Sequence, residues 1–205
     1  MASGCGSTAT ATPAPAEPGA GQGADASVSD DAAAPATAAY PEGPYGTTVG
    51  AVLADMEFGG HYRTETAGLA TESPYETVKL ADIRAKATTK YALIHMSAYW
   101  CGICKSALGK LVPAYPGLAS KATFIDIMVE GASPSDVSTT TQLTSWAKNL
   151  KIPYTILRDP DGVSFRAKND VAPRTMILIV ELKTMAILHR ATDVQAALDK
   201  VKSLD

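Results

Sequence analysis

The sequence predicts a mixed α/β fold in which helices cover both faces of a central sheet, preceded by a disordered tail. Along residues 46–205, apolar stretches of strand length alternate with stretches whose apolar residues recur at helical spacing. Before them, residues 1–45 consist largely of Ala, Gly, Ser, Thr and Pro. Because this segment lacks the apolar surface that would offset the entropy lost on ordering, we expect it to form a linker.

The charges of the chain are unevenly distributed. All 18 Lys and Arg residues lie from Arg63 onwards, so residues 1–62 carry only acidic charge. The basic residues form no run, which argues against a nucleic-acid partner. No stretch approaches the roughly 18 apolar residues that a membrane-spanning helix needs. These observations leave one well-cored domain at residues 46–205.

The first half of this domain begins with short strands. Met56–Arg63, which contains two adjacent glycines, predicts a hairpin or an edge strand. Glu76–Leu80 alternates as a short strand does, and a helical turn should start at Ala81. Tyr91–Ser97 is mostly apolar and of strand length, so it predicts a central strand.

Helices should follow on either side of the next strand. After Cys104, apolar residues recur at i, i+3, i+4 and i+7 until Pro113, which should end or kink that helix. Ala122–Val129 predicts a further strand. Thr139 and Gln142 form a capping box that should start the next helix.

The last part of the chain predicts a strand, a hairpin and a helix. Tyr154–Leu157 has strand character, and Thr175–Glu181 and Met185–Arg190 are close enough to form a hairpin. Thr192 and Gln195 should cap the final helix. Strands linked by helices imply parallel pairing, and the hairpin adds an antiparallel edge.

Two cysteines stand where the strand Tyr91–Ser97 meets the following helix. At a helix N-terminus, unsatisfied amides and the helix dipole favour a thiolate and should lower the pKa of Cys101. A thiolate is the species that attacks a disulfide sulfur. Cys104 shares the apolar face of the helix, so it should lie deeper and resolve a mixed disulfide by bonding to Cys101. The pair therefore predicts a reversible two-electron switch that needs no cofactor.

Metal binding and a structural role are the alternatives for this pair. A zinc site needs four ligands, and the other candidates, Cys5, His61, His95 and His189, form no second pair. A cuprous site made of two thiolates and one histidine needs fewer ligands, and His189 is available for it. Two buried core cysteines are the third alternative. The position at a strand-to-helix junction beside Trp100 favours redox chemistry.

Two segments resemble one family. Trp-Cys-Gly-Ile-Cys-Lys at residues 100–105 resembles the active site of thioredoxins. Residues 171–178 are similar to the family segment that carries a cis proline, here Pro173, and its spacing from Cys104 is similar to that in the extracytoplasmic TlpA/ResA-like branch. The resemblance implies a thioredoxin-like fold. It also implies a thiol–disulfide oxidoreductase that reduces protein disulfides with electrons from a membrane donor. We expect the protein to be a monomer.

The resemblance assigns roles to residues around the cysteines. It implies that Pro173 lies against the disulfide and presents a backbone edge to the substrate; the alternative is an ordinary loop proline. It implies that Trp100 shields Cys101 and forms part of the docking face; the alternative is a core aromatic. Ile103 departs from the family, which usually has Pro between the cysteines.

Two ionisable residues have more open assignments. His95 stands where thioredoxins often carry a buried Asp that moves protons at the resolving cysteine, and an imidazole could do this near neutral pH. It could equally be a hydrogen-bonded core histidine. Glu130 matches loosely a Glu that ResA-like proteins hold near the cysteine pair; its alternative is a solvated loop carboxylate.

The segment around Cys5 suggests where the protein is located in the cell. Ser-Gly-Cys at residues 3–5 resembles the end of a bacterial lipobox, whose Cys becomes acylated. No charged or apolar region precedes it, so we expect that a signal peptide has been removed. This hypothesis makes the protein a periplasmic lipoprotein tethered by its linker; the alternative is an incidental Cys.

Two other functions remain for comparison. A copper-binding chaperone similar to the Sco proteins would use Cys101, Cys104 and His189, although those proteins have three residues between the cysteines and this chain has two. A peroxiredoxin-like peroxidase is disfavoured, because the Pro-x-x-x-Thr-x-x-Cys pattern is absent.

Overall fold

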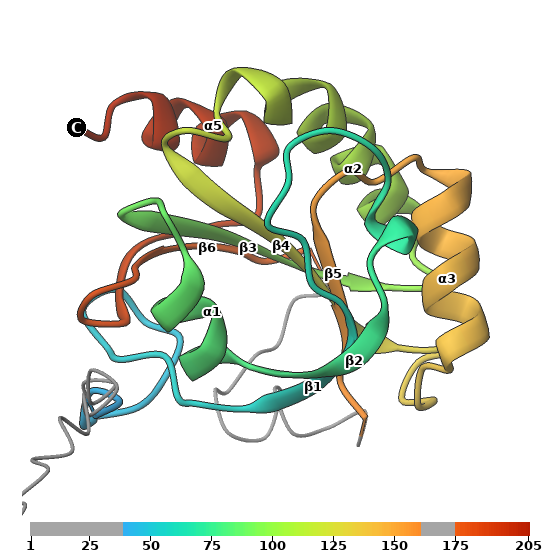
Figure 1. Ribbon diagram of the computed structural model, residues 1–205, viewed down its shortest axis with the longest axis horizontal. Coiled ribbons are helices and arrows are strands. Elements are labelled where there is room, and N and C mark those ends of the chain that lie inside the picture. Colours follow the sequence, from blue (N-terminus) through green and yellow to red (C-terminus); the bar gives the residue numbers. More distant parts are fainter. Residues whose placement is uncertain (1–38, 161–174) are drawn as a thin grey trace, which may run out of the picture. The chain divides into compact units, whose positions relative to one another are not determined.

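The computed structural model describes residues 39–160 and 175–205 (Figure 1). Their seven strands form one sheet in the order β2-β1-β5-β4-β3-β6-β7. The strands are β1 (Glu57–His61), β2 (Tyr75–Lys79), β3 (Tyr91–Ala98), β4 (Ala122–Glu130), β5 (Thr155–Arg158), β6 (Ile177–Glu181) and β7 (Ala186–Ala191). The α-helices of the same residues are α1 (Leu80–Lys86), α2 (Gly102–Ala114), α3 (Thr140–Asn149) and α5 (Val194–Lys202).

The sheet is mixed, as the sequence predicts. β3 pairs in parallel with β4, and β4 pairs in parallel with β5. The β6–β7 hairpin joins the other side of β3 in the antiparallel direction, while β1 and β2 extend the sheet beyond β5. Every residue of β3 is buried, so β3 is the central strand that its apolar sequence predicts.

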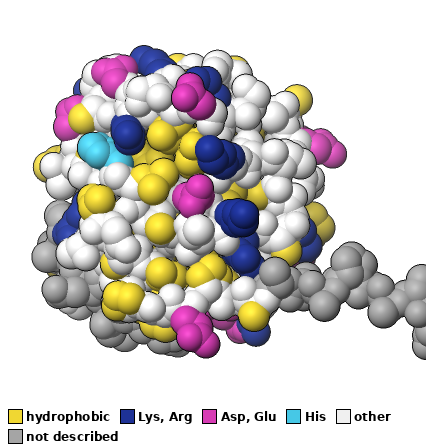
Figure 2. Space-filling view, turned by 90° about the vertical axis from the view of Figure 1, so that its left-hand side faces the viewer, with side chains coloured by type: hydrophobic (Ala, Val, Ile, Leu, Met, Phe, Trp, Pro, Cys, Tyr) yellow, Lys and Arg dark blue, Asp and Glu magenta, His cyan; other side chains and the backbone are white. Residues whose placement is uncertain are grey.

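Helices cover both faces, and each face has its own apolar core. One core contains the buried residues of α2, α3 and α5, among them Leu108, Leu143 and Leu198. The other contains Leu80 and Ile83 of α1, packed with residues of the opposite side of the sheet. Figure 1 shows α2 and α5 above the sheet and α1 below it. The surface drawn in Figure 2 intermixes basic and acidic side chains with exposed hydrophobic ones.

The helix caps agree with the sequence at α3 and differ at α5. Thr139 Oγ1 accepts the N–H of Gln142 at 3.2 Å, and the Gln142 side chain accepts the N–H of Thr139 at 2.9 Å. At α5 the cap is Asp193, whose carboxylate accepts the N–H of Ala196 at 2.8 Å, and not Thr192. A carboxylate both satisfies the free amide and interacts favourably with the helix dipole, which explains the shift by one residue.

The segment Met56–Arg63 is neither a hairpin nor an edge strand, and this prediction was wrong. β1 lies inside the sheet, paired with β2 on one side and β5 on the other. Its glycines allow close packing instead of a turn. A Cβ at Gly60 would lie 2.7 Å from the Cα of Leu157, closer than any real contact.

The contacts of the domain start at Tyr40, within the range expected for the linker. The Tyr40 hydroxyl donates to the carbonyl of Leu53 at 2.7 Å, and its ring packs against the core beside α1. Tyr45 forms a bridge with Val52. The expectations for Cys5 and Pro173 lie outside the described residues. Within residues 39–160 and 175–205, no helix has the length and hydropathy of a membrane span.

Two glycine substitutions test this packing. Gly109 is exposed in α2 with nothing near its Cα hydrogens, so Gly109→Ala should raise the free energy of unfolding by about 0.5–1 kcal/mol. Gly60→Ala should lower it by about 1–3 kcal/mol, because the new Cβ forces β1 and β5 apart. Urea unfolding of both variants measures these changes. Equal effects of the two substitutions would contradict the packing of Gly60.

Candidate active site

Cys101 and Cys104 are joined by a disulfide at the start of α2. β3 ends at Ala98, two residues form the turn, and Cys101 is the N-cap of the helix. The Cα atoms of the two cysteines are 5.3 Å apart. The backbone N–H of Cys104 donates to Cys101 Sγ at 3.1 Å, so the helix cap is made by the sulfur itself.

This cap defines the chemistry of the first cysteine. The first amides of a helix have no partner within the helix, and their dipoles add to a positive potential at its N-terminus. When the disulfide is reduced, the same potential stabilises negative charge on Cys101 Sγ, which makes the thiolate available as a nucleophile.

The two cysteines differ in access. Cys104 is fully buried within the core beneath α2, whereas Cys101 retains 5% of its surface. Next to them, Trp100 is 37% exposed and Ile103 is 72% exposed. An incoming molecule therefore reaches Cys101 first, across an apolar rim, and Cys104 only through Cys101.

Glu130 is held beside the cysteine pair and is not a solvated loop residue. It is the last residue of β4 and is completely buried. Its Oε2 accepts the indole N–H of Trp100 at 2.9 Å, and its carbonyl accepts the N–H of Tyr99 at 3.0 Å. An irregularity in the pairing of β3 and β4 places Glu130 opposite Ala98. Side chain and backbone thus both fix the turn that precedes Cys101.

His95 lies in a buried polar cluster with two residues that the sequence analysis did not single out. Asp126 is its partner on β4, and the carboxylate Oδ1 is 2.7 Å from His95 Nδ1. The other oxygen, Oδ2, accepts the hydroxyl of Ser97 at 2.9 Å. All three side chains are buried. A carboxylate in the otherwise apolar stretch Ala122–Val129 was a signal that could have marked Asp126.

The cluster faces the same side of the sheet as the helix of the cysteines. Alternate residues of β3 and β4 point to one face. Leu93 and Phe124, two positions before His95 and Asp126, belong to the core beneath α2 that also contains Cys104. His95 Nε2 is buried without a hydrogen-bond partner among the described residues.

The remaining predicted residues are not brought together. His189 lies on β7, opposite Ile179, which in turn pairs with Leu93 in the middle of β3. It is therefore two strands away from β3 and well short of the end that carries the cysteines. No cluster of three metal-ligating side chains occurs in residues 39–160 and 175–205. Pro173 lies outside those residues.

Comparison with known proteins rests on the fold. No sequence-family model matches the chain, and no curated protein matches it by sequence. A thiol:disulfide interchange protein from Bacteroides sp. superposes with a TM-score of 0.58 at 13% identity, over 77% of this chain and 90% of that chain. The exposed lipoprotein thioredoxin of Streptococcus pneumoniae strain TIGR4 gives 0.54 at 17% identity, over 74% and 100%. The chain has a thioredoxin fold.

The thioredoxin fold is shared by proteins of different activity. AhpC of Enterococcus faecalis superposes with a TM-score of 0.55 at 14% identity, over 78% of this chain and 92% of that chain. Similarity of fold alone therefore does not select a reaction. The reaction has to be inferred from the residues at the end of β3 and the start of α2.

Substitution of Asp126 tests the buried cluster. Asp126→Ala removes the partner of both His95 and Ser97 and should lower the free energy of unfolding by about 2–4 kcal/mol. Ser97→Ala, which removes one hydrogen bond, should cost about 1 kcal/mol. Urea unfolding measures both, with the exposed Asp136→Ala as the matched control that should leave the midpoint unchanged. If Asp126→Ala unfolds at the same urea concentration as the control variant, the cluster is not formed.

Proposed function

We propose that this protein is a thiol–disulfide oxidoreductase that exchanges its Cys101–Cys104 dithiol with disulfides of partner proteins, in the reducing direction. The observation that carries the proposal is the disulfide at the N-terminus of α2, in which Cys101 retains a small exposed surface and Cys104 is fully buried. A structural disulfide needs no such difference in access. A dithiol that first attacks a substrate and then forms an internal disulfide does need this difference in access.

The reaction proceeds in two exchanges. The Cys101 thiolate attacks one sulfur of the substrate disulfide, a mixed disulfide forms, and one substrate thiolate leaves. The Cys104 thiolate then attacks Cys101 Sγ, which restores the bond present in the structure and releases the second substrate thiolate. The substrate gains two electrons, the protein loses them, and the two released thiolates take up two protons.

His95 is proposed to accept the proton that Cys104 must lose. Cys104 lies in a dry core, where no solvent base reaches it. His95 lies beneath the same helix and has a ring nitrogen without a partner among the described residues. Asp126 holds the other nitrogen, so it would orient the ring and stabilise the imidazolium that forms.

Trp100 and Ile103 are proposed to dock the substrate polypeptide. Both side chains are exposed, although apolar; Trp100 directly precedes Cys101, and Ile103 directly precedes Cys104. Glu130 fixes the indole of Trp100 through its hydrogen bond, so the rim is preorganised. We also propose that Pro173 contributes a backbone edge to the same substrate chain, as the resemblance implies.

We place the protein outside the cytoplasm, as a monomer anchored through an acylated Cys5. Residues 1–45 would serve as its tether and residues 46–205 as its catalytic domain, with a membrane protein as electron donor. Support comes from the lipobox-like Ser-Gly-Cys sequence and from the similarity to a pneumococcal exposed lipoprotein thioredoxin. Two acyl chains on one residue anchor stably, whereas a single chain is marginal.

The alternatives fit the site less well. A copper chaperone would need His189 near the sulfurs, but this residue lies on β7, two strands from β3. A peroxidase of the AhpC kind shares the fold, but the Pro-x-x-x-Thr-x-x-Cys pattern is absent from the sequence.

A trapped intermediate tests the order of attack. In a Cys5→Ser background, Cys104→Ser should form a covalent adduct with insulin that reducing agent reverses, because the mixed disulfide at Cys101 can no longer be resolved. Non-reducing electrophoresis and mass spectrometry detect the adduct. Cys101→Ser in the same background is the matched control and should form none. An adduct of equal yield in the control would reverse the assigned roles.

The reduction potential tests the direction of electron flow. We expect a value near that of thioredoxin, about −270 mV, for the Cys101–Cys104 couple, as a reductant requires. Equilibration with glutathione or dithiothreitol buffers, read by mass spectrometry after alkylation, measures it. A value near the strong oxidant DsbA, about −120 mV, would make the protein an oxidase of dithiols.

A further inference from the structure

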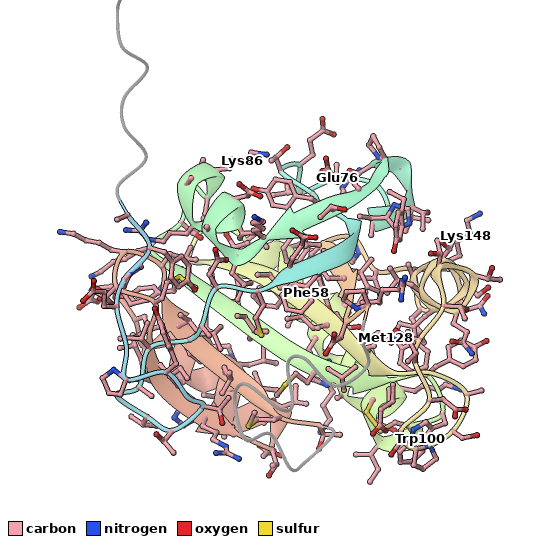
Figure 3. The ribbon with its side chains drawn as sticks, turned by 90° about the horizontal axis from the view of Figure 1, so that it is seen from below. Phe58, Glu76, Lys86, Trp100, Met128 and Lys148 are labelled. Carbon is pink, nitrogen blue, oxygen red and sulfur yellow. A yellow bond between two sulfur atoms is a disulfide. The ribbon has the colours of Figure 1, made fainter. Side chains whose placement is uncertain are left out.

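A cavity lies at the end of the sheet away from the cysteines. It has a volume of about 80 Å³ and is lined by residues at the starts of β3, β4 and β5, the ends of α1 and α2 and the segment after β1. Figure 3 shows Lys86, on its rim, and Trp100 on opposite sides of the domain. The cavity is therefore separate from the candidate active site.

The lining of this cavity consists of cations, hydroxyl groups and apolar groups. It contains two cations, Arg63 and Lys86, together with six threonines and three tyrosines, and it contains no carboxylate. Lys86 Nζ lies 5.4 Å above the ring of Tyr62, which holds the cation at the rim. A lining with this composition favours an anion over a cation or a neutral apolar molecule.

Arg63 is a buried cation whose hydrogen-bonding capacity is not exhausted. Its side chain is only 5% exposed, and its backbone is fixed by hydrogen bonds with Thr155. One end of the guanidinium donates to the carbonyl of Ala67. The carboxylates of Glu65 and Glu72 lie 3.9 and 3.8 Å away on the exposed side, where water weakens such pairs. The Nε–H lacks an acceptor among the described residues.

Tyr154 contributes a second donor without a partner. It is fully enclosed between the rings of Tyr115 and Phe124, and its hydroxyl has no hydrogen-bond partner among the described residues. Burial, with smaller contributions from the charge of Asp126 and from Tyr115, raises the pKa of Tyr154 well above its ordinary value. The phenol therefore stays protonated and is able to donate.

We propose that this cavity binds a small oxyanion, a carboxylate of the size of acetate or an inorganic oxyanion, between Arg63 and Tyr154. The anion would accept hydrogen bonds from the guanidinium Nε–H and from the phenol, which satisfies two buried donors at once. A volume of about 80 Å³ suits a ligand of only a few non-hydrogen atoms. The proposal goes beyond the proposed redox function, since the cavity and the cysteines lie at opposite ends of the sheet.

The experiment titrates the full chain with sodium acetate and, separately, with sodium phosphate at constant ionic strength. Binding is read from the chemical shifts of the backbone amides of Arg63 and Thr155. Tyr154→Phe keeps the aromatic packing and removes the hydroxyl, so it should weaken binding about fivefold. Arg63→Lys keeps the charge and loses the Nε–H, and it should weaken binding about tenfold. Tyr40→Phe, whose hydroxyl bonds Leu53 in the other core, is the matched control.

The titrations with acetate and with phosphate distinguish two kinds of site. Saturable binding by acetate that both cavity variants weaken and Tyr40→Phe does not would support a carboxylate site. The same pattern with phosphate alone would support a site for inorganic oxyanions. Absence of saturation with either anion, or saturation that Tyr154→Phe leaves unchanged, would overturn the proposal. If Arg63→Lys fails to fold, the comparison of Tyr154→Phe with Tyr40→Phe still decides it.

Discussion

The structure depends on the pairing of β3 between β4 and β6. All residues of β3 are buried, and the hydrogen bonds on both sides fix its position along its neighbours. The same register sets His95 opposite Asp126 and Ala98 opposite Glu130. Because the chain leaves β3 directly into the turn before α2, the strand also determines where the two sulfurs lie. A shift of one residue would send the whole polar cluster to the other face of the sheet.

The buried polar groups of β3 and β4 are costly to enclose and are enclosed in pairs. An unpaired charge in an apolar core costs several kcal/mol in typical proteins, whereas a pair with good hydrogen bonds approaches neutrality. Asp126 has two partners, His95 and Ser97, one for each oxygen. Glu130 receives the indole N–H of Trp100. Both carboxylates therefore orient a neighbouring side chain, and the sheet supplies the rigidity that keeps them there.

Much of the fold followed from local patterns. The apolar runs predicted β3, β4 and the β6–β7 hairpin, helical spacing predicted α2, and the capping box at Thr139 marked α3. The cysteine pair and its position at a helix start were predicted in the same way. Gly59 and Gly60 were misinterpreted, because a glycine pair permits a turn and a close strand contact equally well. Asp126 was missed because it is 31 residues from His95, and the register that joins them is a tertiary property. The cavity beside Arg63 is assembled from distant segments for the same reason.

The contact between His95 and Asp126 has an evolutionary consequence. Each side chain compensates for the burial of the other in a dry core. Loss of one of these side chains would leave the other buried without its partner, and selection would then favour replacement of the second side chain as well. Among homologues that diverged under this constraint, the two positions should change jointly, to an apolar pair or to another complementary pair. The two columns would then covary, even in lineages that have kept the cysteines and little else.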